Sequence, residues 1–386
     1  MNTARLLAFN LGSVTLKAAS FEFDSEVPAA DTAFVEEARI ELAVTGDASR
    51  DLQATLDALP PQARTPDVVV HRIVHGGSFE VGRALDEPTF EVLDALAALA
   101  PLHQPVGLAL ARAARLYWPQ ARHGADFDTA FHAHLAPWSR RLPLPADLDA
   151  AGVRRHGFHG LAFASALRRL EALAPGASRG RVIIAHLGGG CSVAAIEGGR
   201  SIDATMGMTP LGGVPMPTRS GDLDPGVIFH LLRLVGDAAR LEQRLLHEAG
   251  LAGIAGYGDM RRLLDDARPD AVLAVEQFTV RIAQAIAAMA IAIGGMDHVV
   301  FCGGSGSRAP RLRDRIAVRL LPLGLVLDPQ RNCTGAARLD AGRGPGAWRI
   351  DVDEELELAE STRAWAFPVP ANGPAPLPDD TTEVAP

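Results

Sequence analysis

Residues 4–23, ARLLAFNLGSVTLKAASFEF, contain two apolar runs separated by a polar turn around Gly12. Apolar runs of this length on either side of a Gly turn predict a β-hairpin. Residues 181–199, RVIIAHLGGGCSVAAIEGG, repeat the pattern, with HLG at 186–188 in the place of NLG at 10–12. A shared three-position pattern is weak support for duplication by itself. One such hairpin in each of two lobes would, however, grip a polyphosphate from two sides.

The length and composition are those of an ordinary globular protein. A chain of 386 residues is too long for one compact core and suits two domains with a cleft. The formal net charge of −9 argues against duplex DNA or an anionic membrane as partner. No stretch reaches about 18 unbroken apolar residues, and the N-terminus does not resemble an export signal. Three unevenly spaced cysteines, Cys191, Cys302 and Cys333, predict neither a disulfide framework nor a zinc site. We therefore expect a cytoplasmic protein that binds no nucleic acid and no membrane.

Other stretches predict single elements. Buried strands are predicted at residues 67–73 and 121–128, the second of which ends at Asp128. A third Gly-rich turn is expected between the strand that ends near Cys302 and a helix with Pro310 near its start. Helical periodicity predicts helices within residues 90–118 with a break at 100–105, within 160–173, within the long apolar stretch 270–295, and within 352–367.

The N-terminal turn has a composition that suits phosphate binding. Asn10, Ser13, Thr15 and Lys17 place amide, hydroxyl and ammonium groups around Gly12, where backbone can approach a phosphate closely. The alternative is an ordinary surface hairpin with polar residues at its tip. The sequence contains no GxxxxGK[ST] pattern, which disfavours the P-loop class.

Two arginines lie in sequence contexts that are unusual for a charged residue. Arg72 lies inside the apolar strand VVVHRIV, and Arg219 lies in the Gly/Pro-rich segment MTPLGGVPMPTRSGDLDPG. An arginine among apolar neighbours must find an anion or reach solvent, because an unpaired buried charge costs several kcal/mol. A structural salt bridge is one explanation. The other is that both guanidinium groups converge on a substrate carboxylate or phosphoryl oxygen.

Acidic and histidine side chains supply further candidates. Asp128 at a strand end and Glu354 in VDEEL are candidates for holding magnesium, although Glu354 could equally be a first-turn helix glutamate. His159, between glycines in GFHG, could donate to a developing negative charge, or it could be solvated or structural. The pair His132 and His134 has no evident third ligand nearby, so we do not predict a metal site there.

Taken in order, these segments resemble the acetate kinase family. FNLGSVTLK, at residues 9–17, is similar to the family's opening NxGSSSxK. The later signatures follow in the family's order as HRIVHGG, APLHQP, FDTAFH, GFHG, HLGGG, TPLGGVPMPTRSGDLDP, IAGYGDMR and DEEL. Nine ordered matches over almost the whole chain cannot reasonably be chance.

The resemblance implies an α/β fold of the actin, sugar kinase and Hsp70-like class, in which two duplicated RNase H-like lobes surround a central cleft. We expect residues 1–129 with 353–368 to form the first lobe and residues 130–352 to form the second, which carries nucleotide-binding loops. Residues 369–386 are expected to form a disordered Pro-rich tail. Family members commonly form homodimers, so we expect a homodimer.

The resemblance also implies a role for each matching residue. Arg72 becomes the carboxylate-binding arginine, Asp128 the catalytic acid, and His159 with Arg219 the stabilisers of the transition state. The acyl group would be bound by Val74, Leu102, Phe158 and Pro210. Magnesium or manganese would be linked to Asn10 and Glu354. ATP would be bound by Ser13, Thr15, Lys17, His186, Leu187, Gly188, Gly189, Gly190, Asp259, Met260, Arg261, Gly304, Ser305, Gly306, Ser307 and Arg308.

The departures from the family pattern lie mostly on the nucleotide side. HLGNG has become HLGGG, with Gly189 in place of asparagine, and GIGEN has become GSGSR at 304–308. GFHGTSH has become GFHGLAF at 157–163, whereas Thr15 replaces a serine and keeps the hydroxyl. These changes leave the nucleotide preference open, and Arg308 could favour pyrophosphate or another donor.

The implied reaction is Mg-dependent, reversible transfer of the ATP γ-phosphoryl group to a short-chain carboxylate by direct in-line attack. Acetate would give acetyl phosphate and ADP. Because a carboxylate is already ionised at neutral pH, alignment and charge neutralisation would carry the catalysis. Val74 takes more room than the alanine expected of propionate-preferring relatives, which favours acetate, although propionate or butyrate remains an alternative. A non-catalytic nucleotide-binding protein of the same fold is the alternative from another class, motivated by the altered loops.

Overall fold

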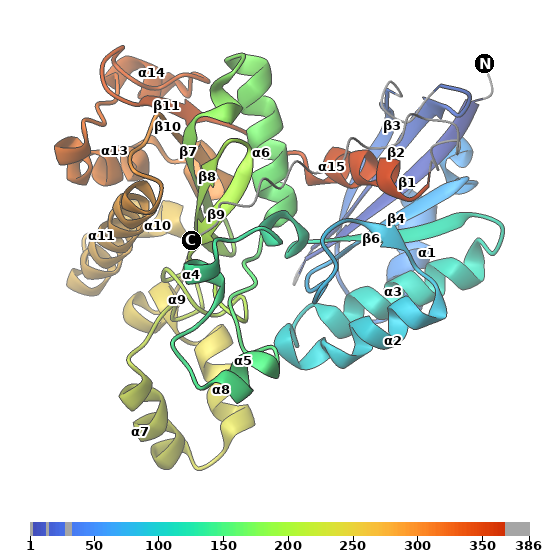
Figure 1. Cartoon of the computed structure of the whole chain (residues 1–386), viewed down its shortest axis with the longest axis horizontal. Helices are drawn as coiled ribbons and strands as arrows, with labels where there is room; N and C mark the ends of the chain where they lie inside the picture. The colour runs from blue at the N-terminus through green and yellow to red at the C-terminus, as the bar shows by residue number, and fades with distance from the viewer. Residues whose placement is uncertain (1–2, 13–14, 28–32, 367–386) are drawn as a thin grey trace, which may run out of the picture.

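The structure is a computed structural model that describes residues 3–12, 15–27 and 33–366. Two β-sheets lie in separate halves of the molecule, and each is packed against helices (Figure 1). The tail expected at residues 369–386 lies outside the described residues. The division of the chain at residues 129/130 and 352/353 stays a prediction.

The first sheet begins with the expected N-terminal hairpin. Its strand order is β3-β2-β1-β4-β6-β5. β1 and β2 are antiparallel, as are β2 and β3, whereas β4 runs parallel to β1 and β6 parallel to β4. The strands are β1 (Thr3–Leu11), β2 (Thr15–Asp24), β3 (Val35–Ala43), β4 (Val68–Ile73), β5 (Arg83–Ala84) and β6 (Arg122–Phe127).

The second sheet repeats this arrangement. Its order is β9-β8-β7-β10-β11, with β7, β8 and β9 antiparallel in sequence and with β10 parallel to both β7 and β11. The order and directions match those of β3-β2-β1-β4-β6, so the expected duplication of an α/β lobe is confirmed. The strands are β7 (Arg181–Leu187), β8 (Cys191–Glu197), β9 (Arg200–Ala204), β10 (His298–Cys302) and β11 (Gly346–Arg349).

Helices account for most of the remaining structure. The α-helices are α1 (Ala48–Ala58), α2 (Glu87–Ala95), α3 (Gln104–Tyr117), α4 (Pro137–Arg140), α5 (Ala146–Ala150), α6 (Gly160–Leu173), α7 (Pro225–Val235), α8 (Ala238–His247), α9 (Gly250–Ala255), α10 (Met260–Asp265), α11 (Pro269–Ala292), α12 (Gly303–Arg308), α13 (Pro310–Arg319), α14 (Pro329–Thr334) and α15 (Glu354–Ser361). Short 3₁₀ turns are η1 (Pro61–Arg64), η2 (Ala97–Leu99), η3 (Ala130–His132), η4 (Ala177–Arg179), η5 (Leu321–Leu323) and η6 (Thr362–Ala364).

Both faces of each sheet are buried, because alternate residues of a strand point to opposite sides. In β1, Leu7 and Phe9 pack with α1 and α3, whereas Leu6 and Ala8 pack with α15. In the second sheet, one face packs with α11 and α13 and the other packs with α6. Although α11 is long and apolar enough to cross a membrane, it contributes buried residues throughout its length to this core.

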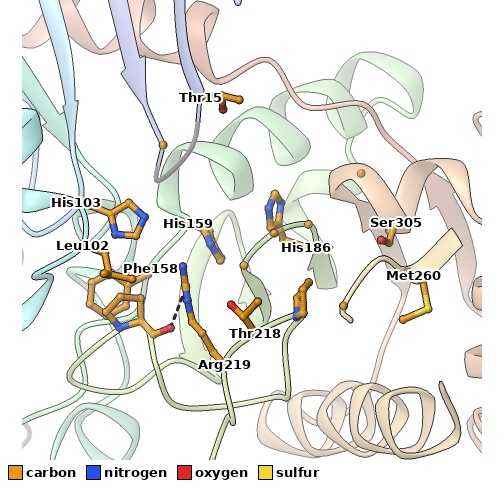
Figure 2. Close-up of a pocket in the computed structure, with 18 of the residues that line it drawn as sticks. Thr15, Leu102, His103, Phe158, His159, His186, Thr218, Arg219, Met260 and Ser305 are labelled. Atoms are coloured by element: carbon orange, nitrogen blue, oxygen red, sulfur yellow. Dashed lines mark hydrogen bonds between the residues drawn. The ribbon is translucent and has the colours of Figure 1, made fainter. Parts of the chain in front are cut away.

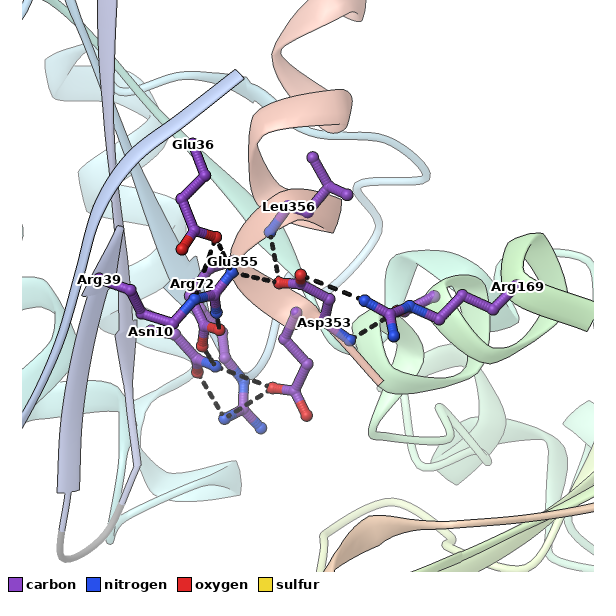
Figure 3. Close-up of polar contacts among 10 residues, drawn as sticks. Asn10, Glu36, Arg39, Arg72, Arg169, Asp353, Glu355 and Leu356 are labelled. Carbon is purple, nitrogen blue, oxygen red and sulfur yellow. Dashed lines mark hydrogen bonds and ion pairs between the residues drawn. The ribbon is translucent and has the colours of Figure 1, made fainter. Parts of the chain in front are cut away.

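Two helices join the lobes. Leu161 of α6 packs in the core of the first lobe, whereas Phe163, two residues later, packs in the core of the second. Asp353, which caps the N-terminus of α15, accepts from Arg39 at 2.8 Å and from Arg169 of α6 at 3.3 Å (Figure 3). The C-terminal helix is therefore tied to both the first sheet and the second lobe.

The stretch after Cys302, expected to be a Gly-rich turn, forms the short helix α12. Only Gly303 has the left-handed φ of a turn, +74°. The fully buried guanidinium of Arg313 then holds the end of the helix, because its Nη1 donates to the carbonyl oxygens of Gly306 and Ser307 at 2.8 Å. These two acceptors would otherwise lack partners at the helix end.

We predict a pH-dependent stability from Asp126 on β6. Burial, with smaller contributions from the charges of Glu357 and Asp128, raises the pKa of its carboxyl from 3.8 to about 7. A carboxyl whose pKa is higher in the folded state loses stability as pH rises, here between pH 4 and 7, by at most about 1.4 kcal/mol per pH unit. Asp126→Asn should therefore gain stability relative to the wild type as pH rises through this range. Urea unfolding at pH 5 and pH 8 measures the difference. An equal difference at both pH values would contradict the prediction.

Candidate active site

A cavity of about 980 Å³ lies between the lobes, and its wall comes from both of them. Figure 2 shows its elongated form, with Leu102, His103 and Phe158 towards one end, Met260 and Ser305 at the other, and His159, His186 and Arg219 between them. A cavity of this size has room for a small acid and a nucleotide together. We call the two ends the acyl end and the nucleotide end.

At the acyl end, the structure brings together all four apolar residues predicted for the acyl group. Val74 follows β4, Leu102 lies in the loop before α3, Phe158 precedes α6, and Pro210 lies in the loop after β9. Val74 and Phe158 are almost completely buried. The resulting surface is small and apolar, which suits a short alkyl group.

Arg72 lies beside this surface and makes a two-pronged ion pair with Asp128. Its Nε donates to Oδ1 of Asp128 at 3.0 Å and its Nη2 to Oδ2 at 2.6 Å. Its Nη1 donates to Oδ1 of Asn10 at 3.1 Å and lies 3.7 Å from Oε2 of Glu354. Both explanations of Arg72 therefore apply, because the arginine is in a salt bridge and also lines the cavity. Burial raises the pKa of Asp128, against the opposing effect of Arg72.

Glu354 and Asn10 form a second layer behind Arg72. Glu354 is the first residue of α15 and lines the cavity, so its helix position and a functional position coincide. Asn10 does not line the cavity. Its Nδ2 donates to Glu354 at 3.0 Å and to the buried Glu355 at 2.6 Å, and Arg39 completes the cluster through an ion pair with Glu355 (Figure 3). Both polar ends of the Asn10 amide are thus used within the protein.

His159 is held in an unusual backbone conformation at the start of α6. Its φ is 62°, and no other non-glycine residue in the described ranges has a positive φ. Backbone strain of this kind persists where the surroundings hold it, often at functional sites. Gly160 allows the close packing, since a Cβ there would lie 2.3 Å from the carbonyl oxygen of Asp128. Burial, assisted by His186, Arg72 and Arg219, holds the pKa of His159 well below its ordinary range, so the ring is neutral at neutral pH.

Arg219 differs from Arg72 because its charge is not compensated. Its side chain is buried, and Nη1 donates to the carbonyl oxygen of Pro210 at 3.2 Å. Among the residues that the structure describes, no carboxylate lies within ion-pair distance of it. Burial accordingly lowers its pKa. A buried cation beside a cavity and without an acidic partner favours binding of an anion there.

Two glycines that directly follow a strand, Gly12 and Gly188, line the cavity. The backbone N–H of Gly12 donates to Thr15 at 2.8 Å, and that of Gly188 donates to Gly190 at 3.0 Å. Both glycines follow the first strand of an antiparallel pair, at the same point of the duplicated fold. The residues predicted to contact ATP that line the cavity are Thr15, Lys17, His186, Gly188, Gly189, Gly190, Asp259, Met260, Arg261, Gly304, Ser305 and Arg308.

Three of the predicted ATP contacts lie away from the cavity surface. Leu187 is fully buried in the core of the second lobe. Gly306 and Ser307 are buried within α12, where the Ser307 hydroxyl donates to the carbonyl oxygen of Ile350 at 3.1 Å. Ser13 lies outside the described residues.

The sequence analysis did not single out several residues that the structure places at the site. His103 lines the acyl end, and burial together with Arg72 and Arg219 lowers its pKa to about 3. The sequence could have indicated this position, because His103 directly follows Leu102 in the motif APLHQP. Glu41 and Thr218 also line the cavity, and nothing in the local sequence marks them.

The comparisons agree with the motifs. A family model described as the Acetokinase family matches residues 5–342. The chain is 41% identical to the acetate kinase of Nitrobacter hamburgensis over 304 residues, which cover 77% of this chain and 75% of that protein. It is 37% identical to the acetate kinase of Clavibacter sepedonicus over 385 residues, or 94% of each chain.

Solved structures give the same result. A propionate kinase from Francisella tularensis aligns with a TM-score of 0.81 at 29% identity, covering 93% of this chain and 98% of that one. Porphyromonas gingivalis acetate kinase aligns with a TM-score of 0.78 at 28% identity, covering 94% and 99%.

Proposed function

The chain belongs to the acetokinase family and is a carboxylate kinase, and from this premise we propose its substrates and the roles of its residues. The reaction is reversible transfer of the γ-phosphoryl group of ATP to a short-chain carboxylate, with acetate as the preferred acid. The products are then acetyl phosphate and ADP. The reaction proceeds by in-line attack of the carboxylate on phosphorus, without an enzyme nucleophile.

The observation that carries this proposal is the buried, uncompensated guanidinium of Arg219 in the middle of the cavity. It lies between the small apolar acyl end and the nucleotide end, which is where a phosphoryl group would pass from donor to acid. Because the charge is buried, an anion at this point is attracted more strongly than it would be in water. Charge that spreads over the phosphoryl oxygens in the transition state would be stabilised by Arg219 and His159.

We propose that Arg72 binds and aligns the substrate carboxylate. Asp128 and Asn10 use three of its five N–H groups, which fixes the guanidinium plane, and the other two make no hydrogen bond within the described residues. The alkyl group of the acid would lie against Val74, Leu102, Phe158 and Pro210. Asp128, the residue proposed as the acid, keeps Arg72 oriented because both of its carboxylate oxygens accept from the guanidinium group.

The residues present fit a magnesium ion, with one difference from the sequence-based expectation. Magnesium is usually held by one or two carboxylates together with substrate phosphates and waters. Glu354 provides a carboxylate on the cavity wall, whereas the Asn10 amide already bonds Arg72, Glu354 and Glu355. We propose that Glu354 holds the ion and that Asn10 orients Glu354. When bound, the ion would neutralise charge on the phosphates.

Two alternatives to an acetate-specific kinase can be distinguished from it. The structural similarity to a propionate kinase supports propionate as a second substrate, since one methylene changes binding by only about 1–3 kcal/mol. A non-catalytic nucleotide-binding protein would need neither the apolar acyl end nor the buried Arg219, so these features favour the enzyme.

We also propose a cytoplasmic homodimer. The free cysteines, of which Cys191 and Cys302 are buried, suit a reducing compartment. The dimer is supported by α7, an apolar helix with no buried residue within this chain. Its exposed side chains include Phe229, 60% exposed, and Leu234, 73% exposed. An apolar helix face of this kind is typical of a surface that a partner subunit covers.

The first prediction from the proposed function concerns the reaction itself. Purified protein with magnesium, ATP and acetate should give acyl phosphate, detected as the hydroxamate, and propionate and butyrate should give less. Arg219→Ala should lower kcat by about 10³ to 10⁵ fold, because a cation that stabilises the transition state is lost. Arg50→Ala, at a side chain that is 79% exposed and does not line the cavity, is the control. The proposal would be rejected if no acyl phosphate formed with any of the acids, or if Arg219→Ala had an unchanged kcat.

The second prediction concerns the space between the proposed catalytic groups. A Cβ on Gly190 would lie 2.7 Å from Nε2 of His159 and 3.5 Å from Nη1 of Arg219. Gly190→Ala should therefore displace the imidazole and lower kcat by about 10² fold or more. Gly207→Ala is the matched control, since its methyl would meet no described atom within 4 Å. Equal rates in the two variants would show that this space is not used.

The third prediction concerns assembly. Phe229→Asp should convert a dimer into a monomer in sedimentation velocity, because a charge would be placed in an apolar contact. Val318→Asp, at a residue 63% exposed on α13, provides the control and should leave the dimer intact. Dimers in both variants would place the subunit interface elsewhere.

A further inference from the structure

Two imidazole rings lie together in the middle of the cavity. The Nδ1 atom of each ring contacts a residue that does not line the cavity. The ring centroids of His159 and His186 are 4.7 Å apart, and both rings line the cavity (Figure 2). Nδ1 of His159 is 2.8 Å from Oγ of Ser192, and Nδ1 of His186 is 3.6 Å from Sγ of Cys302. Neither Ser192 nor Cys302 lines the cavity.

The second sheet produces this arrangement through its register. His186 is on the central strand β7, directly opposite Ser192 of β8 on one side and Cys302 of β10 on the other. Directly opposite residues project to the same face of a sheet. The three side chains therefore form one row, and His159 reaches this row from the start of α6.

Among the described residues, the hydroxyl of Ser192 has one possible hydrogen-bond acceptor, Nδ1 of His159. Ser192 is fully buried, and within the described ranges its hydroxyl has no hydrogen-bonding partner except His159. A buried hydroxyl that does not donate loses a hydrogen bond that water would have supplied. Since His159 is neutral, one of its nitrogens is an acceptor and the other carries the proton. If Ser192 donates to Nδ1, the ring proton lies on Nε2.

The same reasoning applies to His186. Cys302 is fully buried, and burial raises the pKa of its thiol, so the sulfur keeps its proton. The described residues offer the thiol no acceptor other than Nδ1 of His186. Burial also lowers the pKa of His186. A thiol is a weaker donor than a hydroxyl, yet the direction of the bond is the same and again leaves the proton on Nε2.

The Nε2 atoms are the ones that face the glycine turn. An ideal Cβ on Gly190 would lie 2.7 Å from Nε2 of His159, and one on Gly188 would lie 3.1 Å from Nε2 of His186. Phosphoryl oxygens accept hydrogen bonds, so an N–H at these positions attracts them, whereas a nitrogen lone pair repels them. The tautomer of each ring therefore decides whether it helps or hinders the transfer.

We propose that Ser192 and Cys302 are positioning residues, which hold the protons of His159 and His186 on Nε2, facing the phosphoryl group. The role of these protons in the reaction rests on the proposed kinase function. The tautomers themselves do not, because they are properties of the resting protein.

Nuclear magnetic resonance of protein labelled with ¹⁵N at histidine tests the tautomers without any turnover. Long-range ¹H–¹⁵N spectra distinguish a ring protonated on Nε2 from one protonated on Nδ1, and His159→Gln and His186→Gln identify the two signals. In the wild type, both rings should carry the proton on Nε2. A proton on Nδ1 of either ring would overturn the assignment for that ring, whether or not the protein has kinase activity.

Variants then separate positioning from packing. Ser192→Ala should shift only the His159 signals towards the other tautomer, and Cys302→Ala only those of His186. Cys302→Ser, which keeps a donor in a smaller side chain, should retain the wild-type His186 spectrum. Unchanged tautomers in both alanine variants would overturn the proposal, and the wild-type spectrum still decides it if a variant fails to fold.

The kinetic constants kcat and KM should respond differently to these substitutions. Ser192→Ala should lower kcat by about 10 to 100 fold, the usual range for a group that orients a functional histidine, and should leave KM for the carboxylate nearly unchanged. Cys302→Ser should keep most of the activity that Cys302→Ala loses. A loss of kcat that is equal in Cys302→Ser and Cys302→Ala would show that packing, and not hydrogen bonding, is responsible. Absence of turnover in the wild type, with the expected tautomers, would reject the kinase proposal alone.

Discussion

A buried guanidinium must be neutralised, and this requirement at Arg72 organises one wall of the cleft. Its partners come from the end of β6, the end of β1 and the start of α15, as Asp128, Asn10 and Glu354. Asn10 links the set, since one end of its amide accepts from Arg72 while the other donates to Glu354 and Glu355. The last described α-helix, α15, is thereby attached to the first strand of the chain.

The opposite wall has the complementary property. Arg219 is buried without an acid, and its position depends on the carbonyl of Pro210 and on the loop between β9 and α7. One cation is thus held rigidly by acids, and the other remains available to an anion. An anion in the cavity would therefore be attracted more strongly to Arg219, whose charge is not compensated, than to Arg72, whose charge is.

The duplicated fold gives each wall the same row of three strands with different chemistry. In the second lobe the row is Ser192, His186 and Cys302, all uncharged. In the first lobe, Asn10 lies opposite Lys17, and Arg72 follows His71, which is paired with Phe9. The first row therefore carries two cations and the second carries neutral hydrogen-bond donors. Of these side chains, Lys17, Arg72 and His186 line the cavity. A phosphoryl group there would meet two cationic side chains from the first row and the imidazole of His186 from the second.

The sequence by itself determined the family and some of the elements. Apolar runs around Gly12 and Gly188 predicted both hairpins, and the ordered motifs predicted the cavity-lining Arg72, Asp128, His159 and Arg219, because these signals are local. The helix α12 was missed, since its end depends on Arg313, a side chain from the next helix. Only the tertiary structure decided that Asp128 holds Arg72, that the Asn10 amide is already occupied, that Arg219 lacks an acid and that His159 and His186 are backed by Ser192 and Cys302. These contacts join residues up to 345 positions apart, and their partners are fixed by sheet register and by the packing of α6 and α15, which local periodicity does not encode.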